Sequence, residues 1–239
     1  MQSDSESSSI KIDISSSDDV ENIQPQINVN LRDNQKYRTL LLLDATLSMD
    51  ELLQKTSVVL KPIFSSIRNL TNQFEMMVAV YRNYQDGELL FQHSAWESSP
   101  DNLQHFLQNA VARGGSTEGQ EAIEVGLQFA NSQELNQIIL IGDAPPNSKY
   151  QIKQHRKVLS EDYWAKTQFK STHYQDELVL LVSKRVKVHC IYLKNGAKQS
   201  FEEIAAETDG ECAEMKSGKD VGEQLKEFIT DKIGKMMGK

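Results

Sequence analysis

Short, mostly apolar runs alternate along this chain with segments whose apolar residues recur at helical spacing. The runs lie at 39–43 (TLLLL), 74–81 (FEMMVAVY), 137–142 (QIILIG) and 186–193 (VKVHCIYL). A nearly continuous apolar run is typical of a strand that is covered on both faces. Strands that alternate with helices predict the α/β class: a doubly wound, mostly parallel sheet with helices on both faces.

Two stretches depart from this alternation. Residues 88–95 (ELLFQHSA) predict a strand that the turn-forming segment NYQDG joins tightly to the strand before it, so we expect an antiparallel edge strand there. Residues 147–173 show no clear period and carry many bases on an otherwise acidic chain. This stretch is either a solvated loop with a short helix or a segment that helps to select an acidic partner.

Composition divides the chain near residue 36. Residues 1–36 contain no aromatic side chain and carry −4 of the net charge of −8. Low hydrophobicity with this charge predicts a disordered, acidic, Ser-rich tail over 1–36, followed by one folded domain over 37–239.

The overall charge and the rest of the composition narrow the classes of partner and the location. The acidic balance argues against nucleic-acid and anionic-membrane partners. No apolar run is long enough for a membrane span, and the first residues lack the apolar core of a secretory signal. Two cysteines without metal-type spacing are typical of a reducing compartment, so we expect a cytoplasmic protein, with the nucleus as the alternative.

Three segments carry oxygen-bearing side chains where the predicted sheet should end. They are D-x-T-x-S with Asp44, Thr46 and Ser48, the glycine-rich loop that leads to Thr117, and the strand that ends at Asp143. Ligands of doubly wound sheets bind at the carboxyl ends of the strands. Two carboxylates and three hydroxyls are hard oxygen ligands of the kind that Mg²⁺ prefers, with water or a partner in the remaining positions.

Other interpretations of the same residues predict different chemistry. Asp44 and Ser48 could instead cap the following helix. A phosphoryl-transfer site of the haloacid dehalogenase type needs a second acid where Thr46 stands. A receiver domain needs a pair of neighbouring acids at the end of a strand before its phospho-acceptor strand, and no predicted strand ends in such a pair. Gly114-Gly115 without a following lysine does not favour a phosphate-binding loop.

The order of these motifs resembles the von Willebrand factor A (VWA) domain over residues 37–237. The metal-ion-dependent adhesion site (MIDAS) of that family uses D-x-S-x-S, then a threonine, then an aspartate. The resemblance implies that Asp44, Thr46, Ser48, Thr117 and Asp143 are its ligands here. Thr46 replaces the usual serine and Leu47 a common glycine. The segments VAVYRNYQDG and IGDAPPNSKY are similar to intracellular A domains associated with alpha-type protein kinases.

The resemblance implies a binding module and not an enzyme. A Mg²⁺ ion, or Mn²⁺ or Ca²⁺ in its place, that is held mainly by neutral hydroxyls keeps much of its charge and attracts a carboxylate. We therefore expect divalent-cation-dependent capture of an Asp or Glu side chain from a partner protein. The alternative is a regulatory or scaffolding subunit that couples a partner to a kinase or ATPase assembly. Metal-dependent hydrolysis is less favoured because the site has no nucleophile–base pair.

Overall fold

A six-stranded sheet organises the part of the chain that the structure describes. The computed structural model describes residues 36–115, 118–216 and 220–238, so the tail predicted over 1–36 lies outside these residues except for Lys36. The strands are β1 (Tyr37–Asp44), β2 (Phe74–Tyr81), β3 (Phe91–His93), β4 (Gln137–Gly142), β5 (Lys187–Tyr192) and β6 (Cys212–Glu214), in the spatial order β3-β2-β1-β4-β5-β6. Only β3 runs antiparallel among these strands, at one edge. This architecture confirms the predicted fold class.

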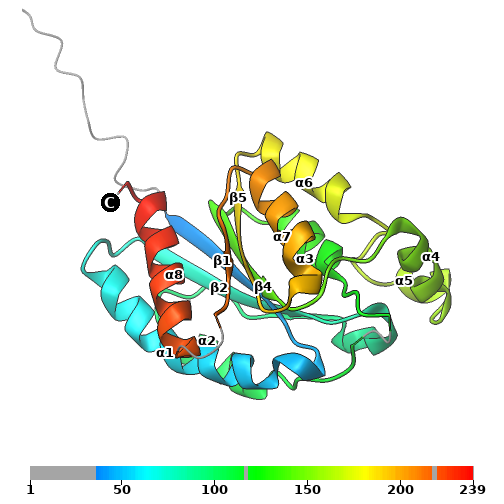
Figure 1. Ribbon diagram of the computed structural model, residues 1–239, viewed down its shortest axis with the longest axis horizontal. Helices are drawn as coiled ribbons and strands as arrows, with labels where there is room; N and C mark the ends of the chain where they lie inside the picture. The colour runs from blue at the N-terminus through cyan, green and yellow to red at the C-terminus, as the bar shows by residue number, and fades with distance from the viewer. Residues whose placement is uncertain (1–35, 116–117, 217–219, 239) are drawn as a thin grey trace, which may run out of the picture. The chain divides into compact units, whose positions relative to one another are not determined.

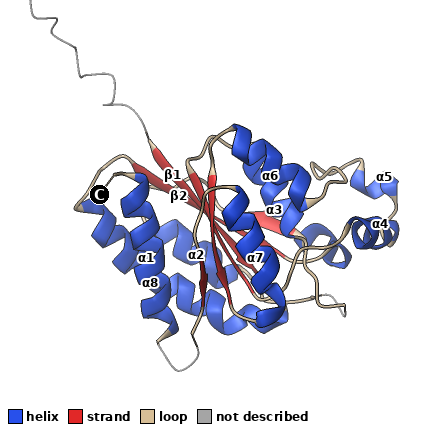
Figure 2. Ribbon diagram, turned by 45° about the horizontal axis from the view of Figure 1, so that its top comes forward, coloured by secondary structure: helices blue, strands red, loops and turns tan. Residues whose placement is uncertain are grey.

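Helices cover both faces of the sheet (Figures 1 and 2). The helices are α1 (Asp50–Arg68), α2 (Asp101–Asn109), α3 (Ile123–Asn131), α4 (Lys149–Lys157), α5 (Glu161–Trp164), α6 (Tyr174–Ser183), α7 (Asn195–Glu207) and α8 (Val221–Met236), with 3₁₀ turns η1 (Leu47–Met49) and η2 (Tyr84–Leu89). One core packs α1, α2 and α8 on the sheet, and a second core packs α3, α6 and α7 on the opposite face. None of the helices in the described ranges combines the length and apolarity needed to cross a bilayer.

The central strand β1 is apolar over Leu40–Leu43 because both of its faces are covered there. Successive side chains of a strand point to opposite faces. Leu40 and Leu42 accordingly belong to one core, and Leu41 and Leu43 belong to the other. All four are fully buried, so the strand that leads into the candidate site is held from both sides.

The stretches 88–95 and 147–173 differ in secondary structure from what the sequence predicts. Within 88–95 only Phe91–His93 pairs with β2, because the chain first turns through η2, where Gly87 takes a φ of +57°. The stretch 147–173 forms two short helices, α4 and α5. Their anchor is Trp164, which is buried with the guanidinium of Arg156 4.8 Å from the centre of its ring. The antiparallel edge strand predicted over 88–95 is confirmed, although β3 covers only Phe91–His93 of that stretch.

Candidate functional site

The loop after β1 carries the first three candidate ligands. Asp44 is fully buried, and its Oδ1 accepts a hydrogen bond from the backbone N–H of Thr46 at 2.7 Å. The hydroxyl oxygens of Thr46 and Ser48 lie 3.4 Å apart. The alternative that Asp44 or Ser48 caps the following helix is wrong, because the residue at the N-cap of α1 is Met49 and no side chain caps that helix. The aspartate instead folds the backbone of its own loop, and Ser48 remains exposed at the surface.

The glycine-rich loop passes directly beside these residues. The backbone N–H of Arg113 donates to the carbonyl of Ala45 at 3.0 Å, which ties this loop to the end of β1. Gly115 has a φ of +111°, which favours glycine, and a Cβ built on it would lie 3.5 Å from the Cβ of Thr46. Thr117, the fourth candidate ligand, lies outside the described residues, two positions beyond Gly115.

The end of β4 brings the second carboxylate to the same edge of the sheet. β1 and β4 pair in parallel, and a Cβ built on Gly142 would lie 3.4 Å from the Cβ of Asp44. The next residue, Asp143, is buried, and its Oδ2 lies 2.6 Å from the ammonium of Lys194. Lys194 belongs to the connection between β5 and α7. The structure thus brings Asp44, Thr46 and Asp143 to the same edge of the sheet.

The electrostatics of Asp44 favour a cation at this edge. Burial raises the pKa of Asp44 from 3.8 to about 7, the hydrogen bonds from Thr46 lower it, and the charge of Asp143 raises it further. The other carboxylate oxygen, Oδ2, is buried and accepts no hydrogen bond from the residues that the structure describes. A buried carboxylate that lacks a partner is costly, and a cation removes that cost. The residues present therefore fit a divalent ion held by Asp44, Thr46 and Ser48.

Two charged residues of the site were not indicated by the sequence. One is Lys194, described above. The other is Glu121, whose buried carboxylate lies 3.4 Å from where a Cβ of Gly115 would be. Burial and the charges of Asp44, Glu121 and Asp143 raise the pKa of Tyr81 well above its ordinary value, so its hydroxyl stays neutral. The only signals in the sequence were the position of Glu121 just after the glycine-rich loop and of Lys194 at the end of an apolar strand.

A metal ion at this edge would need hydroxyl as well as carboxylate oxygens. Over residues 36–115, 118–216 and 220–238, no three His, Cys, Asp or Glu side chains lie close enough together to hold a metal ion. The hydroxyls of Thr46 and Ser48 beside Asp44 are the donors that could complete the set. Hard oxygen donors of this kind suit Mg²⁺.

Solved structures with the same fold include a von Willebrand factor type A protein. No model of a protein family and no curated protein sequence matches the chain. A von Willebrand factor type A protein from Catenulispora acidiphila aligns with a TM-score of 0.50 and 13% identity over 85% of this chain and 43% of its own. The pilus adhesin SpaC from Lactobacillus rhamnosus GG, in its open conformation, aligns with a TM-score of 0.55 and 14% identity over 85% of this chain and 30% of its own.

A third structure matches over almost its whole length. An aerotolerance-related membrane protein from Bacteroides fragilis, carrying multiple mutations to serine, aligns with a TM-score of 0.54 and 12% identity over 83% of this chain and 99% of its own. The described part of the chain therefore has the VWA fold. It spans less than half the length of the first two of these proteins. The resemblance to kinase-associated A domains stays a prediction.

Proposed function

We propose that this chain is a divalent-cation-dependent protein-binding module and not an enzyme. Asp44, Thr46, Ser48, Thr117 and Asp143 would hold a Mg²⁺ ion, and Mn²⁺ or Ca²⁺ could take its place. When bound, the ion supplies a positive charge that a carboxylate of a partner protein can complete. The residues of the chain position that ion at the edge of the sheet and bury the two aspartates that neutralise part of its charge.

The observation that carries this proposal is the buried carboxylate of Asp44 with its unpartnered Oδ2. Asp44 lies beside the hydroxyls of Thr46 and Ser48 and beside a second buried carboxylate, Asp143. In the described structure the negative charge of Asp143 is paired with the ammonium of Lys194, which lies 2.6 Å from Oδ2. An arrangement in which one carboxylate already attracts a cation and the other lacks a partner supports cation binding.

The surface beside the site supports a protein as the partner. Leu47 lies between two candidate ligands with 67% of its side chain exposed. Val111 is 65% exposed on the segment that is tied to the end of β1 through Arg113. Burying such side chains against a partner contributes about 1.5–3 kcal/mol each. The fold shared with the pilus adhesin SpaC supports binding as the general role.

The first test measures metal binding directly. We expect isothermal titration calorimetry of the full chain to detect Mg²⁺ or Mn²⁺ binding that Thr46→Val abolishes, because valine keeps the shape of threonine and loses the oxygen. Thr56→Val is the matched control, since the Thr56 hydroxyl is buried in α1, away from the site, and donates to the carbonyl of Leu52. Equal affinities for the wild type and Thr46→Val would contradict the proposed ligand set.

The second test asks whether the metal serves partner binding. The immobilised chain is exposed to a cell extract in Mg²⁺ and in EDTA, and the retained proteins are identified. The same experiment is repeated with the Asp44→Ala variant. We expect at least one protein to be retained by the wild type in Mg²⁺ and lost both in EDTA and with the variant. Retention that is unchanged by EDTA and by Asp44→Ala would show that binding does not use the metal.

A further inference from the structure

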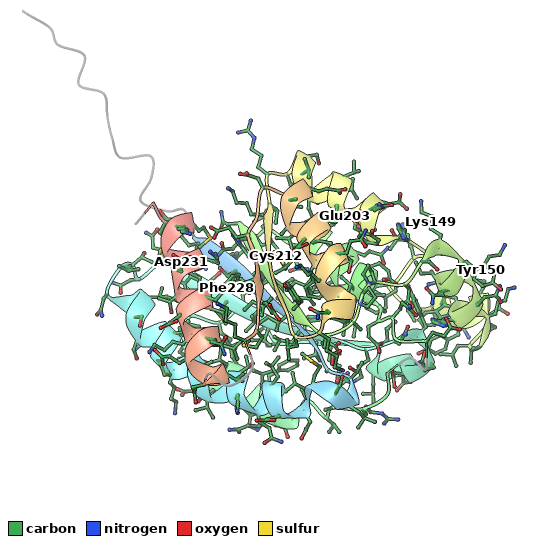
Figure 3. The ribbon with its side chains drawn as sticks, viewed as in Figure 1. Lys149, Tyr150, Glu203, Cys212, Phe228 and Asp231 are labelled. Carbon is green, nitrogen blue, oxygen red and sulfur yellow. The ribbon has the colours of Figure 1, made fainter. Side chains whose placement is uncertain are left out.

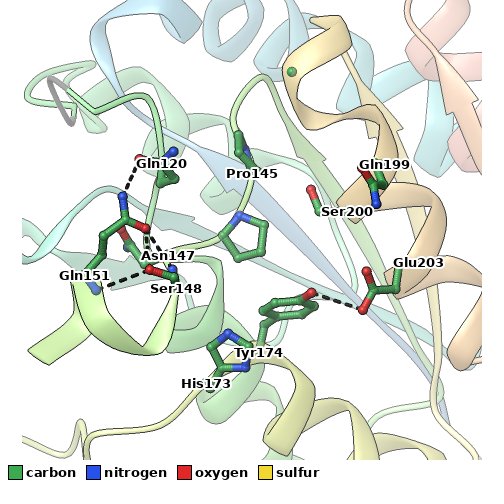
Figure 4. Close-up of a pocket in the computed structure, with 12 residues that line it drawn as sticks. Gln120, Pro145, Asn147, Ser148, Gln151, His173, Tyr174, Gln199, Ser200 and Glu203 are labelled. Atoms are coloured by element: carbon green, nitrogen blue, oxygen red, sulfur yellow. Dashed lines mark hydrogen bonds between the residues drawn. The ribbon is translucent and has the colours of Figure 1, made fainter.

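A cavity of about 390 Å³ opens between the loop after β4 and the helices α6 and α7 (Figure 4). Its walls include Pro145 and Pro146 after β4, His173 and Tyr174 at the start of α6, and Ser200 and Glu203 on α7. This volume is at the lower end of the roughly 300–1,000 Å³ of small-ligand sites. The cavity therefore has room for one large side chain and not for a folded element.

The chain connects this cavity to the candidate metal site at two points. Pro145 follows Asp143 by two residues, and Gly196, which also lines the cavity, follows Lys194 by two. Asp143 and Lys194 form the ion pair described above. Because two extended residues span at most about 7 Å, one segment of a partner could reach both places.

One carboxylate dominates the charge of the cavity. Tyr174 Oη and Gln175 Nε2 both donate to Oε1 of Glu203, at 3.1 and 2.9 Å. No donor among the described residues reaches Oε2, and the side chain of Glu203 is half-buried. In Figure 4 the ring of Tyr174 extends toward this carboxylate.

The bases near the cavity do not cancel this charge. Burial, with the nearby charge of Lys149, lowers the pKa of His173, so its ring is neutral at physiological pH. Lys149 itself lies 3.4 Å from the carboxylate of Asp176. Figure 3 shows Glu203 on α7 and Lys149 on α4 as separate points of this region. The remaining lining groups are amides, hydroxyls and proline rings, which carry no formal charge.

We propose that this cavity is a second subsite, which takes an arginine side chain of the partner protein. The guanidinium would pair with Oε2 of Glu203 and stack on the ring of Tyr174, a combination that suits its planar, charged shape. The subsite rests on the proposed function only for its role beside the metal. The expected partner segment carries an Asp or Glu for the metal and an arginine about two to four residues away.

The direct test titrates the ¹⁵N-labelled full chain with N-acetyl-arginine amide and follows backbone amide shifts by NMR. We expect saturable shifts at Tyr174, Ser200 and Glu203, in EDTA as well as in Mg²⁺. The citrulline counterpart, which has the same shape without the charge, should bind at least about fivefold more weakly. No saturable shift at these residues, or equal affinity for the two probes, would overturn the proposal.

A matched pair of variants isolates the carboxylate. Glu203→Gln should weaken the arginine probe about fivefold. Glu202→Gln removes the same charge from the preceding position of α7, which is exposed, and should leave the affinity unchanged. Equal losses in the two variants would show that only the general charge of the helix matters, and would reject the specific pairing.

The metal dependence separates this proposal from the proposed function. A peptide that contains Asp-Gly-Gly-Arg should bind more tightly than the single arginine probe in Mg²⁺, and the gain should disappear in EDTA. If the arginine probe saturates in EDTA while the chain binds no divalent ion, the cavity stands and the metal-dependent function fails. If the chain binds Mg²⁺ but the arginine probe never saturates, the metal-dependent function stands and the proposed arginine subsite fails.

Discussion

Replacing Asp44 by asparagine should stabilise the protein while it removes metal binding. The buried carboxyl binds a proton more tightly in the folded chain, with a pKa of about 7 against an ordinary value of 3.8. Such a group favours folding fully below pH 3.8, and that contribution is lost as the pH rises to 7. At 1.36 kcal/mol per pKa unit, the ionised carboxylate costs about 4 kcal/mol above pH 7 when no metal is bound.

Asparagine keeps the oxygen that accepts from Thr46 but avoids the charge. Its amide N–H₂ would occupy the position of the unpartnered Oδ2, which offsets part of the gain by about 1–3 kcal/mol. We therefore expect Asp44→Asn to raise the free energy of unfolding by about 2 kcal/mol at pH 8 in EDTA. The advantage should shrink by about 1.4 kcal/mol per pH unit as the pH is lowered below 7.

Urea denaturation followed by circular dichroism at pH 5.5, 6.5 and 8 measures this difference. Asp50→Asn, at an exposed position at the start of α1, is the control. Adding Mg²⁺ should stabilise the wild type and leave Asp44→Asn unchanged. A variant that is no more stable than the wild type in EDTA at pH 8 would refute the reasoning from burial.

Two further predictions concern the surroundings of the two aspartates. Lys194→Met should tighten Mg²⁺ binding about fivefold, because it frees Asp143 from a partly exposed ion pair worth about 1 kcal/mol. Weaker binding in calorimetry would show that the lysine positions Asp143 instead. Gly142→Ala should destabilise the protein by about 1–3 kcal/mol in thermal unfolding, because the new Cβ would lie 2.6 Å from the hydroxyl oxygen of Tyr81. Gly234→Ala, in an open position of α8, should instead be neutral or stabilising by up to about 1 kcal/mol, and equal losses in both variants would contradict the steric explanation.

The sequence predicts the sheet well because its strands are buried on both faces. Runs such as 39–43 and 137–142 each carry a single polar residue, at their first position, so their burial follows largely from composition. The stretch 147–173 could not be predicted in the same way. Its two short helices depend on the packing of Trp164 against Tyr84 and Arg156, which are contacts made by tertiary structure.

The candidate site also has residues that the sequence predicts and residues that only the tertiary structure brings in. Asp44 and Asp143 each end an apolar strand, so their meeting follows once those strands are neighbours in a parallel sheet. Lys194 lies 51 positions after Asp143, and only the pairing of β4 with β5 brings its ammonium to that carboxylate. Thr117 stays a prediction, since it lies outside the described residues.

The fully buried strand β1 also links any ligand of its carboxyl end to the unfolding of the whole domain. Leu40–Leu43 contribute to both cores, so the end of β1 cannot come apart locally while the cores stay intact. A ligand held by Asp44 would therefore be released on global unfolding, and its binding energy would add directly to the free energy of unfolding. At a metal concentration one hundred times Kd this amounts to about 2.7 kcal/mol. The concentration of free divalent ions would then set the thermal stability of the domain as well as its readiness to bind.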